Sequence, residues 1–101
     1  MVDQKKNAYL LQIETNEKLF FRRRQRGDRF EPIGSPGKKK VKDWMIDRKW
    51  DQYAKETVPL IVNKNNQIMW IPGFPPAKEC SINRPYGKVI RLTYHQSSSL
   101  C

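Results

Sequence analysis

The side chains best suited to chemistry are the cations between residues 22 and 42. This stretch, RRRQRGDRFEPIGSPGKKKVK, holds nine of the chain's twenty Lys and Arg residues and only two acids, so it supplies +7 of the formal charge of +10. Its glycines and prolines exclude one long basic helix and predict turns that hold the cations in an array. Because arginine grips phosphate bidentately and lysine adds point charge, the array predicts a site for polyanions.

The lysines at residues 38–40 have a simpler interpretation, a solvated helix face, which is the better one for an isolated run of lysines. Here an arginine cluster precedes them, and we expect the two clusters to meet in space. Charge alone does not distinguish RNA from DNA, anionic lipid or an acidic protein, so the class of partner has to come from other features.

The sequence lacks the combination of residues that hydrolytic catalysis requires. His95 is the single histidine and lies close to the end of the chain, so a nucleophile has no neighbouring base. Asp43 and Asp47 are one helical turn apart, but Lys39 and Lys42 lie near enough to predict a salt-bridged helix face instead of an acid/base pair. A nucleotide loop of the form GxxxxGK[ST] does not occur.

A structural zinc site is also short of ligands. Cys80 and Cys101 are far apart and form no CxxC pair, and His95 is the one nitrogen ligand available. We therefore expect two reduced thiols without a role, and no metal or cofactor in this chain.

Short apolar runs bounded by polar residues predict the strands that position these groups. Residues 8–14 and 18–23, joined by a three-residue polar turn, predict a first β-hairpin. Residues 59–62 and 67–71 flank an Asn-rich turn and predict a second. Residues 88–94 predict a terminal strand.

Helical spacing predicts the middle of the chain. One face of a helix over residues 39–48 would bury Val41, Trp44 and Met45. Asp51 is a predicted cap for a second short helix that ends before Pro59. The expected fold class is α+β: a small single domain with two β-hairpins and a terminal strand packed with one or two short helices.

The aromatic residues could stack on unpaired bases, but most are predicted to be core. Trp44 and Trp70 lie within apolar patterns, whereas Trp50 and Phe74 lie at element ends and are the only two plausible stacking residues.

A chain of 101 residues predicts one domain, which we place at residues 1–95, with a flexible tail at 96–101. Neither a membrane-length apolar run nor a secretion signal is visible, so we expect a cytoplasmic protein, with the plastid stroma as an alternative.

Four motifs in order, RRRQRGDRFEPIG, GKKKVKDWMID, VPLIV and QIMWIPG, closely resemble the C-terminal domain of bacterial and plastid tRNA(Ile)-lysidine synthetases. The resemblance covers residues 20–73 closely and continues through residues 90–94. It implies a domain that grips tRNA while a separate domain with an SGGxDS loop attaches lysine to the anticodon wobble cytidine. ATP and Mg²⁺ would bind only in that separate domain, because this chain contains no SGGxDS loop or other catalytic motif.

The resemblance also implies roles for individual residues. Gly27, Asp28, Gly34 and Gly37 fall on structural turns. The tRNA contacts that it implies are Arg26 and Arg29 of the turn and Lys38, Lys39 and Lys42 of the basic helix. The neighbouring cations complete the set of contacts that we predict: Arg22, Arg24, Lys40 and Arg48.

Two hypotheses about the whole chain stay open. The first is the tRNA-binding domain of a lysidine synthetase, with tRNA and an SGGxDS-containing domain as partners. The second is a stand-alone basic RNA-binding protein with no role in modification. Because Met1 lies only about twenty residues before the matching turn, the chain fits an excised domain, a split subunit or a relic.

Overall fold

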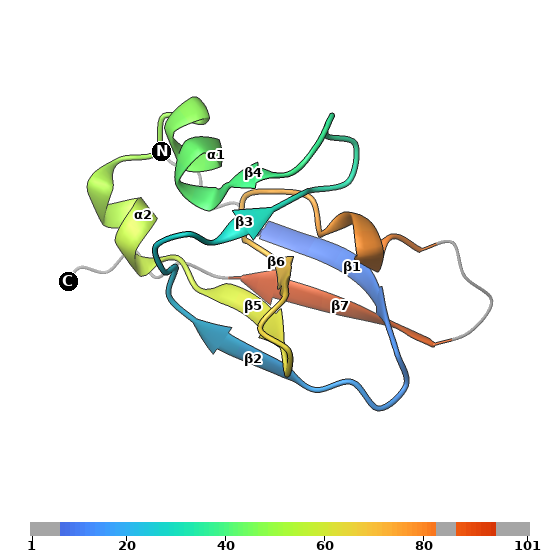
Figure 1. The fold of residues 1–101 in the computed structure, drawn as a ribbon. Coiled ribbons are helices and arrows are strands. Elements are labelled where there is room, and N and C mark those ends of the chain that lie inside the picture. Colours follow the sequence, from blue (N-terminus) through green and yellow to red (C-terminus); the bar gives the residue numbers. More distant parts are fainter. Residues whose placement is uncertain (1–6, 83–86, 95–101) are drawn as a thin grey trace.

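Two antiparallel β-sheets, a short β-ribbon, two short α-helices and a 3-10 helix make up the part of the chain that the structure describes (Figure 1). The computed structural model describes residues 7–82 and 87–94; the predicted tail at 96–101, with Cys101, and also His95 lie outside them. The elements in chain order are β1 (Asn7–Ile13), β2 (Leu19–Arg22), β3 (Arg29–Phe30), β4 (Lys39–Lys40), α1 (Val41–Asp47), α2 (Gln52–Thr57), β5 (Leu60–Asn63), β6 (Ile68–Trp70), the 3-10 helix η1 (Lys78–Cys80) and β7 (Lys88–Tyr94). The predicted α+β class is confirmed.

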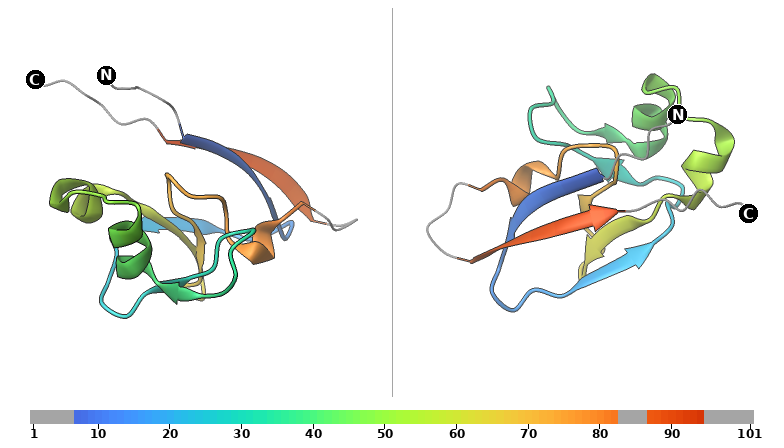
Figure 2. Two further views of the ribbon diagram at one scale, coloured as in Figure 1. Left: turned by 90° about the horizontal axis from the view of Figure 1, so that it is seen from above. Right: turned by 180° about the vertical axis from the view of Figure 1, so that it is seen from behind.

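The layers explain why β5 is buried along its whole length. β2, β5 and β6 form a three-stranded sheet, and β1 pairs with β7 in a second layer. Figure 2 shows the β1–β7 pair lying over the three-stranded sheet, with the ribbon and α1 on the other side. All four residues of β5 are buried, as expected for a strand covered on both faces.

The predicted first hairpin is wrong in its pairing. Both strands exist, but β1 pairs with β7, with Leu11 opposite Ile90, and β2 pairs with β5, with Phe20 opposite Val62. The polar turn after β1 carries the chain from one layer to the other. A seven-residue strand finds a full-length partner in β7, whereas β2 has only four residues to offer.

The second hairpin is confirmed. β5 and β6 are antiparallel neighbours, and Asn66 in their turn has a φ of 66°. Asparagine adopts this left-handed conformation more readily than most residues do, which is why an Asn-rich turn fits here.

The first helix begins two residues later than predicted. Lys39 and Lys40 form β4, and α1 starts at Val41 and ends at Asp47. The second helix, α2, is capped as predicted: Asp51 Oδ1 accepts a hydrogen bond from the Ala54 N–H at 2.8 Å.

The core joins the layers to α1 and to the loop after β6. Its largest fully buried side chains are those of Trp70, Phe30, Phe74, Leu11, Met45 and Leu60. Among the described residues, no helix is long and apolar enough to cross a membrane.

Candidate nucleic-acid interface

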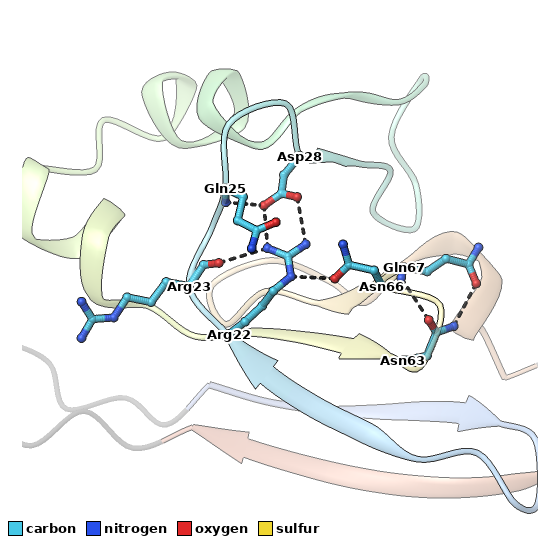
Figure 3. A network of polar contacts seen from close by, with 7 residues as sticks. All are labelled: Arg22, Arg23, Gln25, Asp28, Asn63, Asn66 and Gln67. Carbon is cyan, nitrogen blue, oxygen red and sulfur yellow. Dashed lines mark hydrogen bonds and ion pairs between the residues drawn. The ribbon is translucent and has the colours of Figure 1, made fainter.

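A turn built around Asp28 connects the sheet to the basic ribbon (Figure 3). The Arg22 guanidinium donates two hydrogen bonds to the Asp28 carboxylate, both at 2.9 Å, and the Gln25 N–H donates a third at 2.6 Å. Arg22 also donates to the Arg23 carbonyl at 3.0 Å and to Asn66 Oδ1 at 2.8 Å. Asp28 is thus a structural turn residue, and Arg22 is committed to the fold.

The pKa of Asp28 reflects this environment. Burial raises the pKa of the carboxyl, but hydrogen bonds from Arg22 and the Gln25 N–H, with the nearby charges of Arg22 and Arg24, outweigh burial and hold the pKa below its ordinary value. The carboxylate is therefore ionised at neutral pH and neutralises one arginine of the cluster.

Glycine is required at two positions of this segment. Gly27 has a φ of +88° and Gly34 a φ of +85°, and a Cβ at either residue would meet no atom within 4 Å. Backbone conformation, not space, therefore demands glycine there. Gly37, predicted to share this role, does not have a positive φ.

The ribbon brings the two basic clusters together, as expected. β3 and β4 are antiparallel, with Arg29 opposite Lys40 and Phe30 opposite Lys39. Opposite residues of such a pair project from the same face. Phe30 is buried and Lys39 half-buried on the inner face, whereas Arg29 and Lys40 are both exposed on the outer face.

Loop contacts hold the ribbon against the rest of the molecule. The Val41 N–H donates to the Asp28 carbonyl at 2.9 Å, which fixes the start of α1 beside the turn. Beyond β3, the Ile33 N–H donates to the Pro76 carbonyl and the Lys78 N–H to the Glu31 carbonyl, both at 2.9 Å. The outer cations are therefore displayed from a fixed backbone.

Four of the predicted contacts have partners within the protein. Besides Arg22, Arg24 Nε donates to the Lys55 carbonyl at 3.2 Å. Lys39 forms an ion pair with Asp47 and lies over the Trp44 ring, 4.3 Å from its centre. Arg48 donates to the Gly73 carbonyl at 2.8 Å and lies over the Phe74 ring.

The other five predicted contacts are exposed, and within the described part of the chain their side chains form no hydrogen bond or ion pair. They are Arg26, Arg29, Lys38, Lys40 and Lys42. Arg23, which belongs to the same basic run but not to the predicted contacts, is exposed in the same way. Its position directly after β2, one residue beyond the half-buried Arg22, is the signal that predicts its exposure.

The two predicted stacking residues do not form an exposed platform. Phe74 has no exposed surface, so its prediction is wrong, and Trp50 is half-buried with its ring centre 5.5 Å from that of Phe74. Among the residues whose burial the structure describes, the exposed aromatic side chains are instead Phe20, Phe21 and Tyr53, which belong to the aromatic residues not predicted to stack.

A groove runs between the ribbon and the β5–β6 turn. It has a volume of about 210 Å³, and its walls include Arg29, Lys38, Glu31, Asn66 and Gln67. Within residues 7–82 and 87–94, no group of three or more His, Cys, Asp or Glu side chains could hold a metal ion.

Comparison with known proteins bears directly on this arrangement. The family model described as the TilS substrate C-terminal domain matches residues 19–92, which include the whole ribbon and the Asp28 turn. The chain belongs to this family. The predicted relationship to lysidine synthetase C-terminal domains is confirmed.

Individual relatives agree with the family match. The tRNA(Ile)-lysidine synthase of Persephonella marina is 38% identical over 72 residues, which are 71% of this chain and 16% of that protein. The tRNA(Ile)-lysidine synthase of Shouchella clausii is 33% identical over 79 residues, or 77% of this chain and 17% of that protein. The chain thus spans about one sixth of the length of these curated relatives.

A solved structure shares the fold. The crystal structure of a TilS C-terminal domain superposes with a TM-score of 0.73 at 23% identity, covering 96% of this chain and 77% of that one. This TilS-type domain therefore keeps the layered arrangement that presents the ribbon.

Proposed function

We propose that this chain is a tRNA-binding domain that positions isoleucine tRNA for ATP-dependent lysidine formation at the anticodon wobble cytidine by a separate catalytic domain. The observation that carries the proposal is the Arg29–Lys40 pair across the outer face of the ribbon. Two like charges directly opposite each other destabilise a β pair. Phosphate groups bound at the two cations would turn that repulsion into attraction.

The neighbours of this pair extend the positive electrostatic potential around it. Arg26 lies on the preceding turn, Lys38 precedes β4, and Lys42 follows on the first turn of α1; all three are exposed. The net charge of +10 adds a long-range attraction for any polyanion. A surface of neighbouring cations with few acids can contact successive phosphates of a nucleic-acid backbone. It therefore suits an RNA strand better than it suits a small anion.

The family supports tRNA as the polyanion. The curated relatives are named tRNA(Ile)-lysidine synthases, and this chain corresponds to about one sixth of each. We assign ATP, Mg²⁺ and the chemistry to the remainder of such an enzyme, and tRNA binding to this domain. The cytoplasm, or the plastid stroma, is the proposed place of action because tRNA modification occurs there.

A salt series with a matched pair of variants tests the proposal. Each phosphate contact contributes about 0.7 to 0.9 to the slope of log affinity against log salt concentration. Replacing Arg29 and Lys40 together by alanine should lower the slope for isoleucine tRNA by about 1.4 to 1.8 and weaken binding at every salt concentration.

The control removes the same charge from the other layer. Lys88 and Arg91 are exposed on β7, away from the ribbon, and their double alanine variant should change the slope little. Equal losses in the two double variants would show that net charge alone attracts the tRNA and would refute the ribbon as the binding surface.

A further inference from the structure

The groove beside the ribbon is lined by charged side chains and by side-chain amides. On one side lie Arg29, Lys38 and Glu31 of the ribbon and its loop, and on the other lie Asn66 and Gln67 of the β5–β6 turn. Both amide side chains are exposed at the surface. What the groove can bind depends on which amide atoms face outward.

The orientation of the Asn66 amide is fixed by Arg22. Arginine has only N–H donors, so the atom of Asn66 that lies 2.8 Å from Arg22 Nε must be the oxygen. The Arg22 guanidinium is itself held by the bidentate pair with Asp28. The NH₂ group of Asn66 therefore faces away from this network.

The orientation of Gln67 follows from Asn63 by the same logic. Asn63 Oδ1 accepts hydrogen bonds from the backbone N–H groups of Asn65 and Gln67, at 2.9 and 3.0 Å. Its NH₂ group must then donate, and it lies 2.9 Å from the side-chain oxygen of Gln67 and 3.2 Å from Glu17. Gln67 consequently also turns its NH₂ group outward, and Figure 3 shows the two amide nitrogens pointing to the same side.

The groove therefore offers two neutral donors beside two cations and the carboxylates of Asp28, Glu31 and Glu79. The Asp28 carboxylate is already bound by Arg22. Glu31 lies 3.9 Å from the Lys78 ammonium, and its side chain is 21% exposed, so its carboxylate can still accept a hydrogen bond. A ligand that matches this set must both accept and donate within a short distance. The ribose 2′-hydroxyl does both, and the minor-groove edges of paired bases add acceptor atoms next to it.

A stacked, unpaired base fits the same groove poorly. Recognition of an unpaired base requires an aromatic or guanidinium face to stack on. Phe30 is the aromatic residue in the described wall of the groove, and it is only 2% exposed. The one guanidinium in that wall, Arg29, is assigned here to phosphate together with Lys40. The walls thus favour the sugar edge of a duplex over an extruded base.

We propose that the NH₂ groups of Asn66 and Gln67, with the Glu31 carboxylate, form a subsite for the 2′-hydroxyl edge of an A-form RNA stem whose phosphates lie on the Arg29–Lys40 pair. The subsite rests on the proposed tRNA-binding function and adds to it discrimination of RNA from DNA. Phosphate contacts alone would attract both nucleic acids.

The experiment compares affinities for the isoleucine tRNA transcript and for the DNA strand of the same sequence, which pairs into the same stems. Asn66→Asp keeps an oxygen for Arg22 and tolerates the positive φ, and Gln67→Glu keeps an oxygen for Asn63; each variant loses its outward NH₂ group. Asn65→Asp is the matched control, because it adds the same negative charge to the same exposed turn outside the groove wall.

We expect the wild-type chain to bind the RNA about tenfold or more tighter than the DNA, since several hydrogen bonds are lost with the 2′-hydroxyls. Asn66→Asp and Gln67→Glu should each reduce that ratio by about threefold or more. Asn65→Asp should weaken both complexes in the same proportion and leave the ratio unchanged. Unchanged midpoints of thermal unfolding establish that the variants are folded.

Two different results would overturn the proposed subsite, and the experiment distinguishes one from the other. If tRNA binds but the ratio is the same in all three variants as in the wild type, the subsite is refuted and the proposed function stands. If the wild-type chain does not bind tRNA, the proposed function fails and the subsite fails with it.

Discussion

Arg22 and Arg26 are four residues apart in one basic run, yet the fold uses them differently. Arg22 has a side chain only 16% exposed and donates to Asp28, Asn66 and the Arg23 carbonyl. Arg26 is exposed at the turn. The composition of the run therefore predicts a cationic surface, but the division into structural and available cations depends on Asn66, which is 44 residues away in the chain.

Arg22→Lys tests the structural role. A lysine keeps the charge but cannot make the bidentate pair with Asp28 or reach Asn66 at the same time. We expect the free energy of unfolding to fall by about 1 to 3 kcal/mol, because partly buried hydrogen bonds to a charged group are lost. Urea denaturation measures the change, and Arg26→Lys is the control, with an expected change near zero. Similar values for both variants would contradict the assignment.

The stability of the domain should also depend on the protonation of Asp28. Its folded pKa lies below the ordinary value of 3.8, so the unfolded chain binds more protons than the folded chain in this range. The stability contributed by the ionised carboxylate is therefore fully present above about pH 5 and is lost as the pH falls through the folded pKa.

Asp28→Asn isolates this contribution. We expect the difference in unfolding free energy between the wild type and the variant to be largest near neutral pH and to shrink in acid. Urea titrations at a series of pH values measure it. A difference that does not change with pH would show that the carboxylate charge contributes nothing.

At the scale of elements, local pattern predicted the longer strands β1, β2, β5, β6 and β7, but neither the two-residue strands β3 and β4 nor all of the pairings. The β5–β6 hairpin and the Asp51 cap are short-range features, so the residues that determine them are close in the sequence. The pairing of β1 with β7 depends on which faces are buried in two stacked layers, and a hairpin-length turn after β1 gives no sign of this. The pairing of β3 with β4 places two lysines that were predicted to be helical in a strand.

The turn that leads into this ribbon makes a prediction about glycine. Gly27→Val should lower the free energy of unfolding by about 1 to 3 kcal/mol, because a β-branched residue at a φ of +88° is strained even in open space. Gly37→Val is the control: its φ is not positive and its surroundings are open as well. Equal thermal midpoints for Gly27→Val and the wild type would contradict the requirement.

For the whole molecule, the charged ribbon, the amide-lined groove and the Asp28 turn lie on one continuous region that the family match covers. The residues that we propose as tRNA contacts are separate from the apolar layers that give stability, so variants that test binding can be made without unfolding the domain. Sequence motifs could predict the family because they include both sets of residues. They could not predict the groove, because its two walls meet only in the folded chain.

The last prediction concerns the division of labour between this chain and a catalytic domain. The chain alone should form no lysidine and consume no ATP, because no nucleotide loop or paired nucleophile and base was found in its sequence. Added in trans to an SGGxDS-containing domain that lacks its own C-terminal domain, it should raise the modification of isoleucine tRNA at limiting tRNA concentration. Arg29→Ala with Lys40→Ala should abolish that gain, whereas Lys88→Ala with Arg91→Ala should retain it.

Radiolabelled lysine incorporated into tRNA is the readout. A mixture no more active than the catalytic domain alone, with tRNA binding by this chain intact, would contradict a positioning role. The stand-alone RNA-binding protein without a modification role would then be the better description, since a shared fold does not by itself carry a shared function.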